Sequence, residues 1–265
     1  MTRTKLAFTQ VDAFADRPFA GNQAAVMPLD TWLPDAVLAA IANENNLAET
    51  AFTIPATGDA DFELRWFTPA VEVAMCGHAT LAAGHVLMAG RDAVRFRTRK
   101  AGVLTVARDG DRYRLDLPAV PVVAQDRADV AAALGVPGAA TFQSASAAAE
   151  PAVIVLLPDE AAVRALRPDF RALAATGVMA IATAPGDATD IVSRVFVPVC
   201  GIDEDPVTGA AHAALTPFWA ARLGRDAFSA FQASARGGHV DCRLAGDRVL
   251  LGGGCVTVIE GLFAL

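Results

Sequence analysis

The chain has 265 residues, of which 54% are hydrophobic, and its 22 Lys and Arg against 29 Asp and Glu give a net charge of −7. A chain of this length can bury a large core and form two domains of about 130 residues each. The basic residues are scattered, whereas binding to nucleic acid or to an anionic membrane requires a basic patch. We therefore expect neither kind of partner.

The N-terminal sequence does not resemble a signal peptide, because Gln10, Asp12 and Asp16 interrupt its short apolar stretch. No apolar run approaches the roughly 18 residues that a membrane span needs. The cysteines form no CxxC pair and are too sparse for a secreted disulfide scaffold. They are Cys76, Cys200, Cys242 and Cys255. These features predict reduced thiols and a cytoplasmic protein.

The first half begins its predicted elements with a helix near residues 34–46, where Pro34 and Asp35 suit a first turn. A second helix is predicted over 78–90, with small residues at its start and a terminal glycine as C-cap. Alternating or β-branched apolar residues predict strands around it. These are FELRWF (62–67), VLTVAR (103–108) and YRLDL (113–117).

The second half repeats this order. A buried strand is predicted at PAVIVLLP (151–158) and a helix at 210–224, again ending on a glycine. Further strands follow from the same alternation of apolar residues. They are IVSRVFV (191–197), HVDCRL (239–244), RVLL (248–251) and CVTVIEGLFAL (255–265).

Short sequence matches connect the two halves. RWFTP at 65–69 recurs as RVFVP at 194–198, and CGHAT at 76–80 lies opposite TGAAH at 208–212. Such self-similarity indicates two copies of one unit of about 130 residues. We predict an α+β fold in which each half is a mostly antiparallel sheet wrapped round a central helix. The predicted halves are 1–117 and 118–265, with the last strand free to cross back to the first half.

In both halves a glycine stands where a loop becomes a helix. Gly77 and Gly209 leave room for a ligand to approach the backbone. Unpaired N–H groups and the helix dipole at such a start favour a carboxylate. If the halves bring their equivalent ends together, the two helix starts share one cleft. We therefore expect a small carboxylate-bearing molecule as the ligand.

Five segments in this order resemble the PhzF family of phenazine-biosynthesis proteins, within the diaminopimelate epimerase fold superfamily. They are VDAFADRPFAGNQAAV (11–26), NLAETAF (46–52), FTPAVEVAMCGHATLAAGHVL (67–87), DEDPVTGAAH (203–212) and QASARGG (232–238). The resemblance spans nearly the whole chain. It implies two pseudo-symmetric diaminopimelate epimerase-like halves, an isomerase without a cofactor or metal, a biosynthetic role and a homodimer.

The resemblance also implies roles for individual residues. In a family member that isomerises a dihydro-hydroxyanthranilate, a glutamate moves a proton between substrate carbons, and here that residue is Glu49. The family's partner histidine and aspartate match His78 and Asp205. The expected substrate contacts are Cys76, Gly77, Gly209 and Ala210. Because Ala210 stands where the family usually has a serine, the phenazine precursor is not assured as the substrate.

The chemistry of Glu49 is consistent with this role. A proton shift on carbon needs a base that becomes an acid, in a site that excludes water. Leu47, Ala48 and Phe52 flank Glu49, and apolar surroundings make a carboxyl group a weaker acid. The alternative is a surface carboxylate at the end of the first helix. A structural hydrogen-bonding role is the alternative for His78. Asp203 and Glu204 are expected to be solvated loop charges or partners for the dipole of the following helix.

Cys76 raises alternatives to the glutamate mechanism. A metal site is not expected, because Cys76 and His78 lack further ligands at zinc spacing and a helix start repels cations. A two-thiol racemase is disfavoured because Thr208 occupies the second thiol position. A one-thiol epimerase or dehydratase that uses Cys76 stays open. So does a small-molecule-binding protein without catalytic activity.

Overall fold

The computed structural model describes residues 4–145 and 151–265. They form two compact units. Unit 1 contains the residues up to Leu117 together with Gly252–Leu265, and unit 2 comprises Pro118–Leu251. The C-terminal segment therefore groups with the first part of the chain and not with residues 118–251. In the described residues, no helix is both long enough and apolar enough to span a membrane.

The sheet of unit 1 has the strand order β18-β1-β2-β3-β4-β6-β7-β8, with β5 beside β4. Neighbouring strands are antiparallel except β2 with β3 and β4 with β6. The strands are β1 (Lys5–Ala13), β2 (Asn22–Pro28), β3 (Glu49–Pro55), β4 (Phe62–Phe67), β5 (Glu72–Val73), β6 (Ala93–Thr98), β7 (Val103–Asp109), β8 (Arg112–Pro118) and β18 (Cys255–Ala264).

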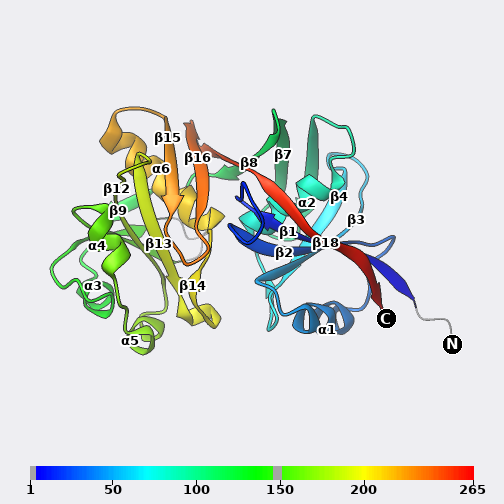
Figure 1. Cartoon of the computed structure of the whole chain (residues 1–265), viewed down its shortest axis with the longest axis horizontal. Helices are drawn as coiled ribbons and strands as arrows, with labels where there is room; N and C mark the ends of the chain where they lie inside the picture. Colours follow the sequence, from blue (N-terminus) through cyan, green and yellow to red (C-terminus); the bar gives the residue numbers. More distant parts are fainter. Residues whose placement is uncertain (1–3, 146–150) are drawn as a thin grey trace. The chain divides into compact units, whose positions relative to one another are not determined.

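Helix α2 (Gly77–Leu87) lies against the inner face of this sheet, where it contacts β1, β2, β3, β6, β7 and β18 (Figure 1). Its small residues allow the strands to approach closely. A Cβ on Gly84 would lie 2.4 Å from Val106 Cγ1, so only glycine fits this contact. On the outer face, α1 (Asp35–Asn45) packs through Leu38 and Ile41. The predicted sheet round a central helix is confirmed for unit 1.

Unit 2 pairs its strands in the same pattern. The order is β9-β10-β11-β12-β13-β15-β16 with β14 beside β13, and the parallel pairs are β11 with β12 and β13 with β15. The strands are β9 (Val122–Ala124), β10 (Ala140–Ser144), β11 (Ala152–Leu156), β12 (Met179–Pro185), β13 (Ile191–Val197), β14 (Ile202–Asp205), β15 (Ala227–Gln232), β16 (Gly238–Ala245) and β17 (Arg248–Gly253).

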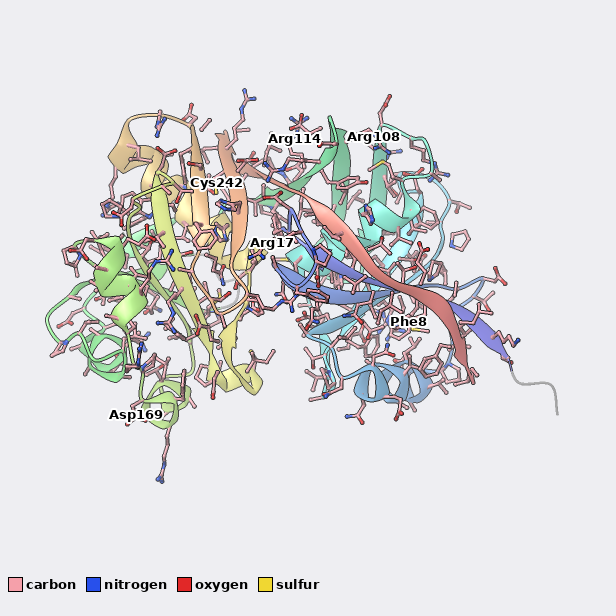
Figure 2. All side chains as sticks on the ribbon, in the orientation of Figure 1. Phe8, Arg17, Arg108, Arg114, Asp169 and Cys242 are labelled. Carbon is pink, nitrogen blue, oxygen red and sulfur yellow. The ribbon has the colours of Figure 1, made fainter. Side chains whose placement is uncertain are left out.

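Helix α6 (Gly209–Leu223) is the counterpart of α2 in unit 2. It contacts β16, and Trp219 donates a hydrogen bond to Thr183 on β12. Thr216 and Cys242 take the places of Gly84 and Val106, and Cys242 is buried on β16 (Figure 2). The other face of the sheet is covered by short helices that the sequence did not reveal. These are α3 (Ala128–Ala133), α4 (Glu160–Ala165) and α5 (Phe170–Ala175), with the 3-10 turn η1 (Pro198–Cys200) after β13.

The two central helices end differently. Gly224 caps α6 in the left-handed conformation, with φ of 66°, as predicted. The prediction of a glycine cap at Gly90 is wrong, because α2 ends with Met88 in the right-handed helical conformation. A terminal glycine two residues further along was mistaken for the helix end.

Each unit also contains an arginine in an equivalent place, buried in unit 1 and half-buried in unit 2. Arg65 on β4 donates two hydrogen bonds to Glu72, and Arg194 on β13 donates two to Glu204. Bidentate pairs of this kind fix the orientation of both side chains. Glu204 is therefore an ion-pair partner, which corrects the expectation of a solvated loop charge.

Candidate functional site

Glu49 is the first residue of β3, paired with Ala24 on the neighbouring parallel strand β2. It does not belong to the end of α1, which stops at Asn45. Asn46 then adopts a left-handed conformation, with φ of 48°, that turns the chain into the strand. The Glu49 side chain is 14% exposed and its Oε2 atom is buried. The surface-carboxylate alternative is therefore disfavoured.

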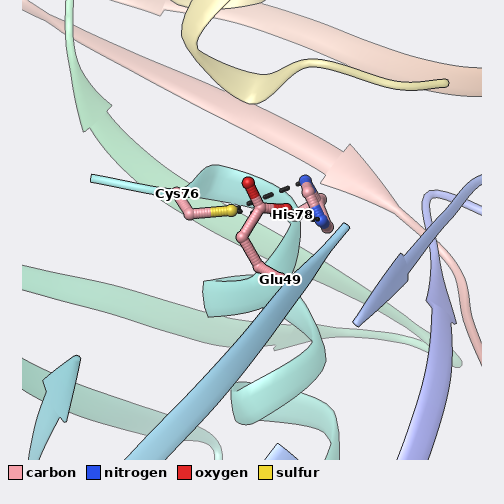
Figure 3. A group of neighbouring side chains, drawn as sticks. All are labelled: Glu49, Cys76 and His78. Carbon is pink, nitrogen blue, oxygen red and sulfur yellow. Dashed lines mark hydrogen bonds and ion pairs between the residues drawn. The ribbon is translucent and has the colours of Figure 1, made fainter. Parts of the chain in front are cut away.

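The start of α2 brings two further side chains to Glu49 (Figure 3). His78 Nε2 lies 2.9 Å from Glu49 Oε2, and Cys76 Sγ lies 3.6 Å from His78 Nδ1. Both residues are buried, Cys76 at the N-cap and His78 in the first turn. No side chain caps α2 in the described part of the chain, so first-turn N–H groups are left for other acceptors.

A fourth residue, Asn22, completes the surroundings of the imidazole. Its Nδ2 atom lies 3.1 Å from His78 Nδ1, and the residue has no exposed surface. Asn22 is the first residue of β2 and pairs with Ala13 of β1. Both ring nitrogens of His78 therefore have a polar neighbour, which fixes the plane of the ring.

The electrostatics give the Cys76 thiol and the Glu49 carboxylate different properties. Burial, assisted by the nearby Glu49, raises the pKa of Cys76 to about 11, so the thiol is protonated at neutral pH. Burial lowers the pKa of His78, while Cys76 and Glu49 raise it, and the net pKa lies well above the usual value. A neutral thiol is a poor base, and Glu49 is the better proton acceptor of this group.

The same three side chains offer the donor atoms of a metal site. One donor atom each from Glu49, Cys76 and His78 lies within 4.8 Å of the other two. Sequence spacing missed this set because Glu49 comes from a different strand. A zinc ion would bind the thiolate form of Cys76 and would therefore have to displace the thiol proton. The uncapped start of α2 also disfavours a cation.

Asp205 lies in unit 2, where it closes a buried hydrogen-bond network. Thr208 Oγ1 donates to Asp205 Oδ2 at 2.5 Å. Gln232 accepts from the Thr208 backbone N–H at 2.9 Å and donates to the Asp205 carbonyl at 2.7 Å. All three residues are buried. The network holds the Asp205 carboxyl group and the N-cap of α6 in one arrangement.

Gly209 and Ala210 begin α6 directly after this network, and no side-chain cap is formed there by the described residues. His212, in the first turn, has no exposed surface and its Nδ1 lies 2.8 Å from the Thr208 carbonyl. The equivalent contact in α2 is the hydrogen bond that Thr80 Oγ1 donates to the Cys76 carbonyl. His212 therefore has a structural role.

Within unit 1, the structure brings together Glu49, Cys76 and His78 with the backbone of Gly77. Asp205, Gly209 and Ala210 belong to unit 2, and a cleft shared by both helix starts stays a prediction. Sequence reasoning assigned no role to Asn22 or Gln232. Both residues lie inside the segments that carried the family resemblance, which was the available signal.

Comparison with known proteins gives one family for nearly the whole chain. The sequence profile of the PhzC-PhzF family, described as "Phenazine biosynthesis-like protein", matches residues 11–261. A Pseudomonas aeruginosa protein named "Uncharacterized isomerase" is 48% identical over 98% of this chain and 99% of its own.

Solved structures agree with this result. A PhzF-family phenazine biosynthesis protein of Enterococcus faecalis has 38% sequence identity and a TM-score of 0.87 over 99% of this chain and 100% of its own. A predicted epimerase of Pseudomonas aeruginosa has 20% identity and a TM-score of 0.76, over 97% of this chain and 99% of its own. This last similarity concerns the fold alone, which is α+β and of the diaminopimelate epimerase type.

Proposed function

Because the chain belongs to the PhzC-PhzF family of phenazine biosynthesis-like proteins, we propose that it is an isomerase that moves a proton on a small carboxylate-bearing molecule without a cofactor. The observation that carries this proposal is the buried contact between Glu49 and His78, 2.9 Å apart. Glu49 lies at a strand end, where its carboxyl group is fixed in place but not fully covered.

In the proposed reaction, Glu49 is first a base and then an acid. A substrate C–H bond breaks, its proton binds one carboxylate oxygen, and the electron pair stays delocalised over the substrate. The proton then returns to a different carbon, or to the other face of the same carbon. No electrons are exchanged, so no redox group is needed. Effective proton transfer requires this carboxyl group within about 3 Å of the reacting atom.

His78 and Asp205 are proposed to assist this transfer by stabilising charge on substrate oxygens. The uncapped starts of α2 and α6 supply N–H groups that suit the substrate carboxylate. Gly77 and Gly209 leave these N–H groups approachable, with Cys76 and Ala210 as neighbouring contacts. A homodimer in the cytoplasm with a biosynthetic role completes the proposal. The absence of a serine hydroxyl at Ala210 favours a substrate other than the phenazine precursor.

The reaction can be tested in D₂O with a panel of unsaturated and cyclic carboxylic acids, followed by NMR. The acid that gains deuterium fastest is then used for two variants. Glu49→Gln keeps the size of the side chain but removes the proton acceptor, and should lower exchange by the 10²–10⁴-fold typical of general acid–base catalysis. Cys76→Ala should lower exchange less than about tenfold, because a protonated thiol does not accept the substrate proton.

Two outcomes distinguish the alternatives. If Cys76→Ala abolishes exchange and Glu49→Gln retains it, a one-thiol epimerase or dehydratase replaces the glutamate mechanism. If acids bind but none exchanges in the wild-type protein, a small-molecule-binding protein without catalysis is the better description. Binding of the acid to Glu49→Gln, measured by calorimetry, separates a loss of chemistry from a loss of binding.

A further inference from the structure

Asn22 contacts the imidazole of His78 on the side opposite to Glu49. The amide nitrogen Nδ2 lies 3.1 Å from Nδ1, whereas the carboxylate oxygen Oε2 lies 2.9 Å from Nε2. Asn22 is completely buried and His78 is only 4% exposed. Asn22 is the first residue of β2 and His78 lies in the first turn of α2, so the contact joins two buried side chains from regular secondary structure.

This geometry determines where the ring carries its proton. An amide nitrogen only donates, so Nδ1 must accept with its lone pair. A neutral imidazole that accepts at Nδ1 carries its single proton on Nε2. That nitrogen is the one beside the Glu49 carboxylate. At Nδ1 the arrangement pairs the amide donor with the ring acceptor, and at Nε2 the N–H group lies beside the Glu49 carboxylate, with Oε2 2.9 Å from the nitrogen.

The Glu49 carboxylate has the opposite effect on the ring, because it favours a second proton. Burial is the largest single influence on the pKa of His78 and lowers it, whereas Cys76 and Glu49 together raise it well above the usual value. Cys76 is the other titratable group in contact with the ring and is a neutral thiol at pH 7. A second ring proton would have to occupy Nδ1, where it would face the amide N–H of Asn22. Asn22 therefore opposes the protonation that Glu49 favours.

We propose that Asn22 is a positioning residue that keeps His78 neutral, with its proton on Nε2. The ring then has no lone pair to offer Glu49, so a proton that Glu49 takes from the substrate is not passed to His78. It can only return to the substrate. The role in catalysis rests on the function proposed above, whereas the state of the ring does not depend on it.

The state of the ring can be read by ¹⁵N NMR of histidine-labelled protein without any substrate. The four histidines of the chain make assignment practical, and His78→Gln identifies the signals of His78. At pH 7 we expect one protonated nitrogen, Nε2, and one unprotonated nitrogen, Nδ1. In Asn22→Asp the new carboxylate accepts from Nδ1, and both nitrogens should be protonated at pH 7. In Asn22→Leu the donor that opposes a second proton is absent, so the ring with protons on both Nε2 and Nδ1 should become populated.

Two controls separate this effect from a general disturbance. Asn45→Asp places a carboxylate at a half-buried position that contacts Thr50 and not the ring, and should leave the His78 signals unchanged. His85 is an internal standard, since its nitrogens contact Tyr113 and Thr257 and should give the same signals in every variant.

A wild-type ring with both nitrogens protonated at pH 7, or with its proton on Nδ1, would overturn the proposal. Unchanged His78 signals in Asn22→Asp would do the same. Should that variant not fold, the wild-type spectrum and Asn22→Leu still decide. The outcome is independent of Glu49 chemistry, because a failure of Glu49→Gln to slow deuterium exchange would leave the NMR result standing.

Discussion

Unit 1 and unit 2 place different side chains at the same positions of one fold. At the start of α2, Cys76 and His78 flank Gly77, whereas at the start of α6 the flanking residues are Thr208 and Ala210. Glu49 and Met179 hold the same place in their strands, because each is the first residue to pair with the preceding parallel strand.

The two units share backbone features at their helix starts but differ in the side chains around them. The backbone features that suit a carboxylate, a glycine and an uncapped helix start, are present in both units. The Glu49 carboxyl group and the His78 imidazole have no counterpart at the equivalent positions of unit 2, which hold Met179 and Ala210. Unit 2 instead ties Thr208 to Asp205 and Gln232 in a closed network. The two units thus share the backbone of a helix start and differ in the side chains beside it, and the proton transfer proposed above depends on the side chains of unit 1.

The largest predicted effect concerns His212, the counterpart of Thr80. Burial lowers the pKa of His212 from 6.5 to about 4, against the raising effect of the Thr208 carbonyl. The unfolded chain therefore binds a proton below pH 6.5 that the folded protein takes up only near pH 4. At about 1.4 kcal/mol per pKa unit, the free energy of unfolding should fall by roughly 3 kcal/mol between these pH values.

His212→Thr, which gives α6 the residue of α2, should remove this contribution. Urea unfolding of both proteins at pH 7 and at pH 4.5 measures it. The variant should lose less stability than the wild type on acidification, whatever its stability at pH 7. Equal losses in the two proteins would show that His212 does not titrate as a buried neutral group.

A smaller effect should follow from replacing the contact between Gly84 and Val106 in unit 1 with the residues found at the equivalent positions of unit 2. Gly84→Thr places a Cβ 2.4 Å from Val106 Cγ1 and should destabilise the protein by about 2 kcal/mol through overpacking. Unit 2 holds Thr216 and Cys242 at the equivalent positions. The double variant Gly84→Thr, Val106→Cys should therefore regain part of the loss. A double-mutant cycle in urea that gives strict additivity would mean that the two contacts are not equivalent.

The smallest predicted effect concerns the short helices found in unit 2. Asp169 (labelled in Figure 2) accepts a hydrogen bond from the backbone of Ala172 and so caps the six-residue helix α5. Asp169→Ala should cost about 1 kcal/mol of unfolding free energy, whereas Asp169→Asn keeps an acceptor oxygen and should cost much less. Equal losses in thermal unfolding would assign the effect to charge and not to capping.

The sequence predicted the parts of this fold that depend on local patterns. The strands of RWFTP and RVFVP and the helices after Gly77 and Gly209 follow from apolar periodicity and from the internal repeat. The short helices α3, α4 and α5 have only six residues each, which is too short for a reliable period.

The sequence named three side chains that lie together in unit 1, those of Glu49, Cys76 and His78, but it did not predict their contacts. Glu49 and His78 were named from motifs, yet their distance of 2.9 Å depends on how β3 crosses α2. The contact between Asn22 and His78 spans 56 positions of the sequence, and no local pattern reports such a pairing. The left-handed conformation of Asn46 ends the helix shortly before Glu49, and the sequence pattern did not predict this change from helix to strand.

The pairing of β1 with β18 has a consequence for the order in which the protein forms during synthesis. Lys5 lies opposite Ala264, so unit 1 cannot complete its sheet until β18 has left the ribosome. Unit 2 is complete at Leu251 and can fold while unit 1 still lacks a strand. A ribosome stalled shortly after unit 2 emerges should therefore carry a protease-resistant second unit beside a protease-sensitive first one. The unit that holds Glu49 is then the last to become native, so a truncated chain has no finished site.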